Sequence, residues 1–272
     1  MKYYKWFAGL TPKKVYDEQN ALSLAVACEL AYENKREIFA TVKTWGFTPL
    51  DFISRKKGRD IDTQCYIMAN SNDVVVVFRG SEKTPDWFTN FQAMQNPGPL
   101  KKTGAHEGFQ DALFPAVIAL TRHIDTQTNK RIWVTGHSLG GALSSLYAGM
   151  LFENGLDVYG IYTFASPRPG NAAFEQQLNK RVLGPHYRIV NDGDIVPHLP
   201  PEPFFSHPGR RIILKSRTKE TTKGSWLKQR ITALKQFIKL TGQTFDIADN
   251  HRLAADNKSY IPRLIKDLKR VN

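Results

Sequence analysis

Apolar and polar positions follow two different periods in the first third of the chain. Residues 17–32 carry apolar side chains at helical spacing, which predicts an amphipathic helix. Residues 63–68 alternate as a strand does, residues 70–73 are polar and favour a turn, and residues 74–78 are apolar throughout. A continuous run rich in β-branched residues predicts a strand that is buried on both faces.

Strand-like and helix-like segments then alternate along the rest of the chain. The pattern predicts strands at 131–135, 158–165, 187–190 and 211–214, and helices at 107–125, 142–153, 172–180, 226–240 and 260–271. Such alternation is typical of an α/β protein with a sheet flanked by helices. Composition shifts at no point sharply enough to mark a boundary, so we expect one domain over residues 1–272.

Length and composition narrow the class of protein further. A chain of 272 residues with 41% hydrophobic residues suits one large domain. The two cysteines, Cys28 and Cys65, suggest free thiols rather than a disulfide framework. Neither an apolar run of the roughly 20 residues that span a membrane nor a signal peptide is recognisable. We therefore expect a cytoplasmic protein, or one exported by a route that needs no leader.

The chain is basic, with 38 Lys and Arg residues against 25 Asp and Glu, and residues 210–239 hold ten of the former and one of the latter. Residues 215–241 predict a basic helical insertion in which Lys228, Lys235 and Lys239 share one face. Such a helix can lie on an anionic membrane surface; the alternative is a helix packed on the domain with a solvated lysine face. Nucleic acid is not an expected partner, because charge alone favours it and no recognition motif accompanies the charge.

The strongest chemical signal is Gly136-x-Ser138-x-Gly140, which lies between a predicted strand and a predicted helix. This is the context of a nucleophile elbow, a strained turn that lifts the serine hydroxyl above the sheet. Larger side chains at the two glycines would clash with neighbouring elements. The N–H of Leu139, at the start of the helix, would point toward an oxyanion. We interpret His137 as a packing residue, because adjacent positions at this turn point apart.

A serine nucleophile needs a base that accepts its proton and an acid that fixes the tautomer of the base. In this class of fold the acid and then the histidine follow the serine along the chain. Several side chains after Ser138 qualify as acid or base: Asp192, Asp194, His198, His207 and His251. The residue pattern by itself leaves these alternatives open.

Short motifs elsewhere in the chain bear on the choice. They are Phe78-Arg79-Gly80-Ser81, Asp86-Trp87, His106-x-Gly108-Phe109, the elbow itself, Ser166-Pro167-Arg168-Pro169-Gly170-Asn171, Asn191-x-x-Asp194-x-Val196-Pro197 and His207-x-Gly209. Together, and in this order, they resemble the fungal-type (class 3) lipase family of α/β-hydrolases. The resemblance implies an α/β-hydrolase fold with a mostly parallel central sheet, flanking helices and a lid-like segment after the first central strand. We expect a bacterial member of the family.

The resemblance also implies a role for individual residues. The acid of the family corresponds to Asp194, and its histidine corresponds to His251 rather than His207. The second oxyanion donor of the family corresponds to Ser81, which follows the Phe-Arg-Gly run. Ser81 is equally a candidate to cap the next helix.

Residues 82–104 correspond to the segment that resembles a mobile lid in the lipases of this family. Trp87, Phe88 and Phe91 are the candidate lid and substrate-contacting side chains, and Trp87 and Phe91 recur at helical spacing. The alternative is an amphipathic helix that packs permanently on the domain, as in esterase-like relatives.

The resemblance predicts a carboxylic ester hydrolase, specifically a triacylglycerol lipase that acts through Ser138, His251, Asp194 and an acyl-enzyme. An acylglycerol or another lipid ester is the expected partner, and neither a metal nor an organic cofactor is expected. A phospholipase A1, which the basic stretch favours, and a soluble-ester (feruloyl-type) esterase are the alternative enzymes. An inactive hydrolase scaffold used for binding is the alternative outside catalysis.

Overall fold

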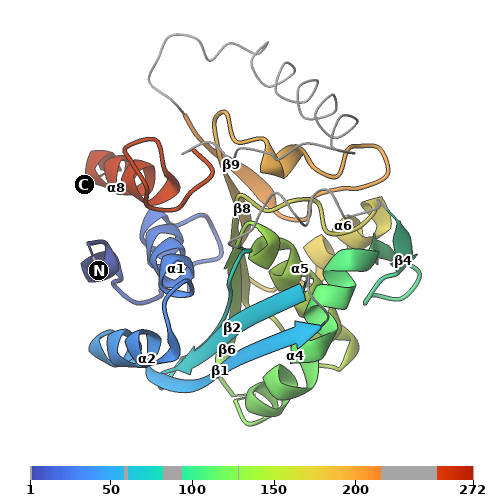
Figure 1. Cartoon of the computed structure of the whole chain (residues 1–272), viewed down its shortest axis with the longest axis horizontal. Helices are drawn as coiled ribbons and strands as arrows, with labels where there is room; N and C mark the ends of the chain where they lie inside the picture. Colours follow the sequence, from blue (N-terminus) through green and yellow to red (C-terminus); the bar gives the residue numbers. More distant parts are fainter. Residues whose placement is uncertain (1, 58–60, 82–93, 128, 216–249, 272) are drawn as a thin grey trace.

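A mixed sheet forms the middle of the molecule (Figure 1). The computed structural model describes residues 2–57, 61–81, 94–127, 129–215 and 250–271. Within these residues seven strands pair in the order β1-β2-β3-β6-β7-β8-β9. The strands are β1 (Thr48–Lys57), β2 (Ile61–Ala69), β3 (Asp73–Phe78), β6 (Arg131–His137), β7 (Gly160–Phe164), β8 (His186–Asn191) and β9 (Arg210–Leu214).

The sheet combines an antiparallel edge with a parallel centre. β1 pairs antiparallel with β2 and β2 antiparallel with β3, whereas β3, β6, β7, β8 and β9 are parallel neighbours. All six residues of β3 are buried, as the apolar run predicts. The carboxyl ends of the parallel strands meet at one edge, which is where ligand sites lie in such sheets.

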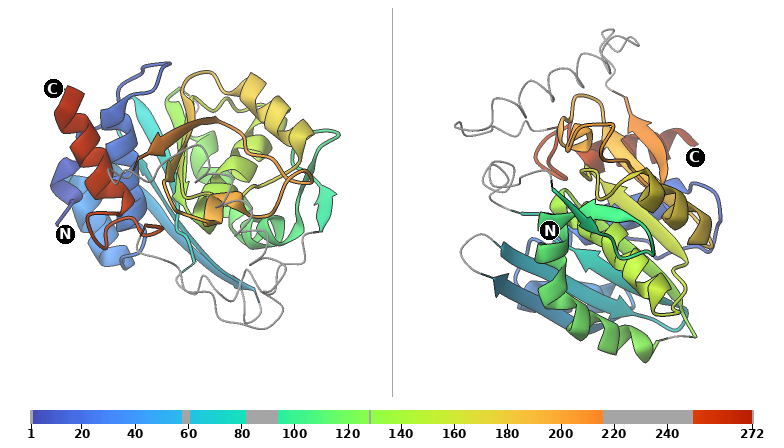
Figure 2. Two further views of the ribbon diagram at one scale, coloured as in Figure 1. Left: turned by 90° about the horizontal axis from the view of Figure 1, so that it is seen from above. Right: turned by 90° about the vertical axis from the view of Figure 1, so that its right-hand side faces the viewer.

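Helices cover both faces of the sheet (Figure 2). On one face lie α4 (Glu107–Asp125), α5 (Leu139–Glu153) and α6 (Ala172–Arg181), and on the other α1 (Glu18–Leu30), α2 (Lys35–Thr44) and α8 (Tyr260–Val271). A hydrophobic core lies on each face of the sheet, and successive residues of β3 point into them alternately. Val74 and Val76 pack against the first group of helices, and Val75 and Val77 against the second. The smaller elements are η1 (Tyr4–Trp6), η2 (Val196–His198) and the strand pair β4 (Gln95–Pro97) and β5 (Gly104–His106).

The observed architecture confirms the predicted α/β class, and it also shows what the pattern missed. No element was predicted between residues 33 and 62, where the structure has α2 and β1. β1 is an edge strand with β2 as its neighbour, so its apolar alternation is weak, and α2 buries only Ile38 and Val42. Helix α5 begins at Leu139 rather than at residue 142, because the glycines in its first turn lower the helical signal. The predicted helix at 226–240 lies outside the described residues.

The structure bears on two expectations from composition, which concern the cysteines and membrane-spanning helices. Cys28 and Cys65 are free thiols, as expected, and both are buried. Cys28 lies 3.3 Å from the hydroxyl of Thr135 on β6. No helix among the described residues is both long enough and apolar enough to cross a membrane.

Candidate active site

Ser138 occupies a sharp turn between the end of β6 and the start of α5. Its backbone has φ 55° and ψ −128°, in the half of φ space that residues with a Cβ rarely adopt. The N–H of Ser138 donates to the carbonyl of Phe164 on β7 at 2.9 Å, which ties the turn to the neighbouring strand. A strained conformation held in this way is the expected geometry of a nucleophile elbow.

The two elbow glycines are required by close contacts between backbones. A Cβ added to Gly136 would lie 2.2 Å from the carbonyl oxygen of Gly140, and a Cβ added to Gly140 would lie 2.3 Å from that of Phe78. Both gaps are far shorter than van der Waals contact, and the atoms in the way are backbone atoms that cannot turn aside. The clash that the Gly-x-Ser-x-Gly motif predicts is therefore confirmed at both positions.

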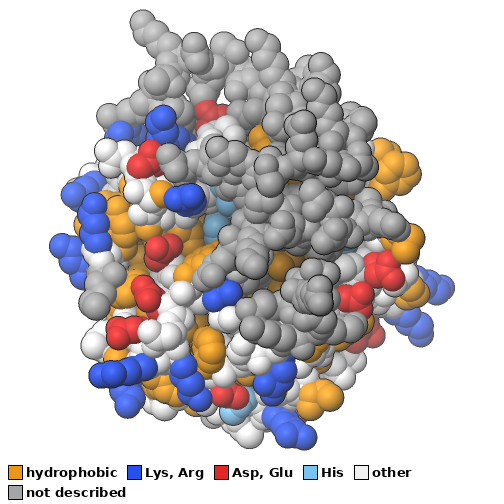
Figure 3. Space-filling view, in the orientation of Figure 1, with side chains coloured by type: hydrophobic (Ala, Val, Ile, Leu, Met, Phe, Trp, Pro, Cys, Tyr) orange, Lys and Arg blue, Asp and Glu red, His pale blue; other side chains and the backbone are white. Residues whose placement is uncertain are grey.

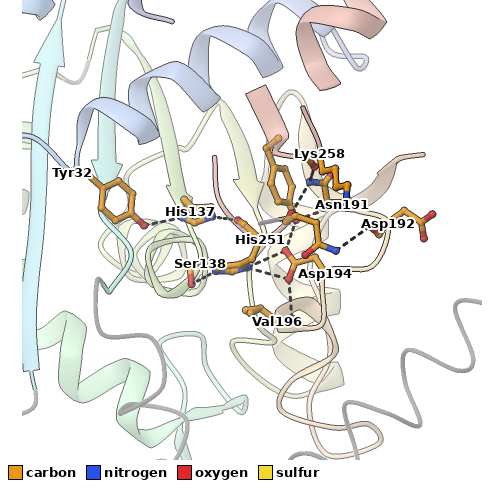
Figure 4. Close-up of polar contacts among 11 residues, drawn as sticks. Tyr32, His137, Ser138, Asn191, Asp192, Asp194, Val196, His251 and Lys258 are labelled. Atoms are coloured by element: carbon orange, nitrogen blue, oxygen red, sulfur yellow. Dashed lines mark hydrogen bonds and ion pairs between the residues drawn. The ribbon is translucent and has the colours of Figure 1, made fainter. Parts of the chain in front are cut away.

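Ser138, His251 and Asp194 form one chain of hydrogen bonds (Figure 4). The Oγ of Ser138 lies 3.0 Å from Nε2 of His251. Nδ1 of His251 lies 3.1 Å from both carboxylate oxygens of Asp194. All three side chains are buried, and Ser138 is only 1% exposed. The sequence-predicted nucleophile, base and acid thus meet although they come from three separate segments.

The carboxylate of Asp194 receives two further hydrogen bonds that hold it beneath His251. Its Oδ1 accepts the N–H of Val196 at 3.0 Å, and its Oδ2 accepts the hydroxyl of Tyr260 at 2.7 Å. Burial, followed by the charge of Asp194, raises the pKa of the Tyr260 hydroxyl well above its usual range. Tyr260 therefore remains a protonated donor, and the orientation of the carboxylate is set from three sides.

The alternative acid and base residues lie elsewhere. Asp192 precedes the acid by two residues, and its backbone carbonyl accepts a hydrogen bond from Asn250 at 3.4 Å. Nε2 of His207 donates to the carbonyl of Pro197 at 2.6 Å, and burial holds the pKa of His207 well below its usual range. His198 is buried in η2. Of the alternatives that the residue pattern left open, Asp194 and His251 are the two that the structure joins to Ser138 by hydrogen bonds; their catalytic role stays a prediction.

The two predicted oxyanion donors lie on segments that border Ser138. Leu139 is the first residue of α5, where backbone N–H groups have no partner within the helix. Gly80 directly precedes Ser81, and a Cβ on Gly80 would lie 3.1 Å from Cβ of Ser138. This placement is compatible with the role predicted for Ser81, which stays a prediction.

Other sequence predictions fall on parts of the chain outside the described residues. These are the lid candidates Trp87, Phe88 and Phe91, and the lysines Lys228, Lys235 and Lys239. Among the described residues, no group of three or more His, Cys, Asp or Glu side chains is placed to hold a metal ion.

His137 does more than pack, contrary to its interpretation from the sequence. Its Nε2 lies 2.8 Å from the backbone carbonyl of His251, and its Nδ1 lies 2.8 Å from the hydroxyl of Tyr32 (Figure 4). A carbonyl can only accept, so Nε2 must carry the proton and Nδ1 must accept from Tyr32. The side chains of His137 and Ser138 do point apart, as argued. That of His137 points to the backbone of His251, the candidate base.

Burial keeps this bridge in one protonation state. Burial, together with the nearby His251, lowers the pKa of His137 to about 3. The backbone of Gly80 passes close to the hydroxyl of Tyr32, because a Cβ added to Gly80 would lie 2.4 Å from that oxygen. Two hydrogen bonds therefore connect Tyr32 to the backbone of His251 through the side chain of His137.

Sequence reasoning missed the supporting residues Tyr32, Asn191 and Tyr260. Asn191 stands in the motif that contains Asp194, so its position was a usable signal. Tyr32 and Tyr260 carry no local signal, because each lies beside a helix end and contacts residues far away in the chain. Their roles become visible only when the segments are brought together.

The sheet, the elbow and the hydrogen-bonded triad define an α/β-hydrolase fold with the constellation of a serine hydrolase. Residues 75–204 match the family model described as "Lipase (class 3)". The predicted resemblance is thereby confirmed for the segment that carries Ser138 and Asp194. His251 lies beyond the matched residues.

Known proteins show the same likeness. The chain is similar to a lipase of Rhizomucor miehei, with 34% identity over 173 residues that cover 59% of this chain and 47% of the relative. It is also similar to secreted mono- and diacylglycerol lipase 1 of Fusarium solani, with 34% identity over 48% of this chain and 40% of the relative. A solved structure of the R. miehei triacylglyceride lipase aligns with a TM-score of 0.63 and 27% identity, covering 73% of this chain and 81% of that one.

These alignments have two consequences. The chain spans about half the length of the curated relatives it matches, or less. Both of these relatives are fungal, and they do not support the expectation of a bacterial source.

Burial of the neutral His106 side chain predicts that the folded protein loses stability in acid. Burial lowers the pKa of His106, which stacks on Phe109, to about 4. In the unfolded chain His106 takes up a proton near pH 6.5, whereas in the folded chain it stays neutral until the pH approaches 4. Its contribution to the free energy of unfolding is therefore complete above about pH 6.5 and is lost as the pH falls toward 4. We predict that His106→Phe reduces the slope of unfolding free energy against pH in this window by up to about 1.4 kcal/mol per pH unit. Urea melts at several pH values measure the slope; parallel curves for the two proteins would contradict the prediction.

Proposed function

We propose that this protein is a carboxylic ester hydrolase that cleaves acylglycerols through an acyl-enzyme on Ser138. The observation that carries the proposal is the chain of hydrogen bonds from Ser138 through His251 to Asp194, on an elbow whose strain is held by close backbone contacts. The names of the similar proteins, a lipase and a mono- and diacylglycerol lipase, support the choice of substrate class.

The geometry supports a two-step reaction. Oγ of Ser138 attacks the ester carbonyl carbon while Nε2 of His251 takes its proton, and Asp194 accepts the hydrogen bond from Nδ1 and stabilises the imidazolium. The tetrahedral oxyanion is stabilised by the N–H groups of Leu139 and Ser81. His251 then passes the proton to the leaving alcohol oxygen, which departs and leaves the acyl group on Ser138.

The second step returns the enzyme to its starting state. A water molecule attacks the acyl carbonyl as His251 takes its proton, and a second tetrahedral intermediate collapses to free acid. His251 gives the proton back to Oγ of Ser138. Each step uses groups that the triad already places within hydrogen-bond distance.

Burial of the nucleophile bears on the kind of substrate. Ser138 is 1% exposed, so atoms that cover it must move before an ester carbonyl can reach its hydroxyl. A phospholipase A1 and a soluble-ester esterase use the same chemistry and differ in the ester that is admitted. The triad alone does not distinguish these substrates, and the acylglycerol is favoured by the similar proteins.

We predict that a fluorophosphonate labels the native protein and that Ser138→Ala abolishes the labelling and at least about 10³-fold of the ester turnover. Thr135→Ser, a mild change at a buried position on the same strand, serves as the control and keeps the label. A pH-stat panel of tributyrin, long-chain triacylglycerol, phosphatidylglycerol vesicles and soluble short-chain esters identifies the substrate class, and acylglycerols should turn over fastest.

Absence of both labelling and turnover in the native protein would favour the inactive scaffold. Labelling together with faster turnover of phosphatidylglycerol would replace the acylglycerol with a phospholipid as the substrate. A preference for soluble esters would select the feruloyl-type esterase. The labelling and the substrate panel therefore test the chemistry and the substrate separately.

Contact with an anionic membrane is a second part of the proposal, and the basic composition of residues 210–239 favours it. On the described part of the face shown in Figure 3, Lys and Arg side chains are scattered among Asp and Glu rather than gathered in one patch. In the sequence, residues 210–239 carry nine of the thirteen excess positive charges of the chain. Each basic residue near such a surface contributes about 1 kcal/mol of attraction.

We predict that the protein pellets with phosphatidylglycerol vesicles at low salt and that the triple Ala variant of Lys228, Lys235 and Lys239 pellets at least about 10-fold less. Phosphatidylcholine vesicles control for the lipid charge. A second triple Ala variant controls for net charge and replaces exposed lysines on described parts of the chain: Lys14, Lys43 and Lys180. Equal pelleting of the two variants would remove the proposed contact.

A further inference from the structure

Asn191 is the last residue of β8, and its side chain is fully buried beside the triad. Figure 4 shows its hydrogen bond to Lys258, in the segment that follows His251. The two hydrogen bonds that its carboxamide donates go to backbone carbonyls. Its position places its amide against the backbone of the segment from Asn250 to Lys258.

The carboxamide of Asn191 holds that segment near both of its ends. Its Nδ2 donates to the carbonyl of Asn250 at 2.7 Å and to the carbonyl of Lys258 at 2.7 Å. Both partners can only accept, so the NH2 group must face them, and one amide uses both of its hydrogens on this segment. Asn250 directly precedes His251, so one of the two bonds lies a single residue from the base.

The backbone of Asn191 reaches the acid as well. Its N–H donates to the hydroxyl of Tyr260 at 2.9 Å, and that hydroxyl donates to Oδ2 of Asp194. Its carbonyl accepts the N–H of Asp194 at 3.2 Å. One residue at a strand end therefore fixes the acid through its backbone and the segment of the base through its side chain.

The segment needs such support because it lies in neither a helix nor a strand. Residues 250–259 consist of turns and bends, and α8 begins only at Tyr260. Its own hydrogen bonds join Arg252 and Leu253 to the start of α8 and Asp256 to Ser259, so its first residues, Asn250 and His251, depend on bonds to other elements. The carbonyl of His251, the residue after Asn250, accepts a hydrogen bond from Nε2 of His137.

We propose that Asn191 is a positioning residue that keeps the imidazole of His251 in line between Ser138 and Asp194. The proposal rests on the ester hydrolase function proposed above. It assigns to the amide a function in catalysis that acts through the backbone of the base, and it requires a side chain with two donors at this position. A misplacement of about 1 Å at such a centre costs about 10²-fold in rate.

The direct test is Asn191→Asp, which keeps the shape of the side chain, removes both donors and places a carboxylate against two carbonyl oxygens. Asn191→Ala is the second variant and removes the donors without adding charge. The matched control is Asn154→Asp, because Nδ2 of this exposed residue also donates to a backbone carbonyl, that of Met150 at 2.8 Å. Turnover is expressed per site that reacts to completion with a fluorophosphonate, so unfolded protein is not counted.

We expect both Asn191 variants to lose about 10²-fold in kcat with KM nearly unchanged, while Asn154→Asp behaves as the native protein. The downfield proton NMR signal of the His251 Nδ1–H should broaden or vanish in the two variants. A purely structural role would lower Tm but leave kcat per reactive site and this signal unchanged, and that result would overturn the proposal. An inactive native protein would instead refute the hydrolase function, so the two failures are distinguishable.

Discussion

The backbone turn at Ser138 is the constraint on which the rest of the site depends. A residue with a side chain is held at φ 55° there, and the turn closes only because Gly136 and Gly140 bring backbones together where a Cβ would overlap. The cost of the strain is of the order of 1–3 kcal/mol, and β6, α5 and the end of β3 must hold the turn in place. In return the hydroxyl stands at the edge of the sheet and the start of α5 faces it.

The other parts of the site differ in how firmly the fold places them. Asp194 follows a parallel strand, and the sheet brings such strand ends together without further help. His251 has no strand before it and depends on individual hydrogen bonds from His137 and Asn191 to its segment. We therefore infer that the buried polar residues around the triad, His137 and Asn191, hold His251 in place rather than Ser138.

Sequence reasoning reached the nucleophile from local pattern alone, because the Gly-x-Ser-x-Gly spacing, the strand before it and the helix after it all lie in one short stretch of the chain. His251 was selected from three histidines only through a resemblance, since 113 positions separate it from Ser138. The function of His137 was not predictable from its neighbours, because its partner is a backbone carbonyl 114 positions away. Strand β1 and helix α2 were missed for a different reason, namely that an edge strand and a half-exposed helix bury too few side chains to leave a clear pattern.

The proposed mechanism requires a covalent acyl group on Ser138 during turnover. Rapid acid quench of the native protein with a slowly hydrolysed acylglycerol or aryl ester, followed by mass spectrometry of the peptide that contains Ser138, tests this requirement most directly. We expect this peptide to gain the mass of the acyl group and to lose it at the rate of acid release. Hydrolysis of the ester at the native rate with the peptide unmodified throughout would contradict it.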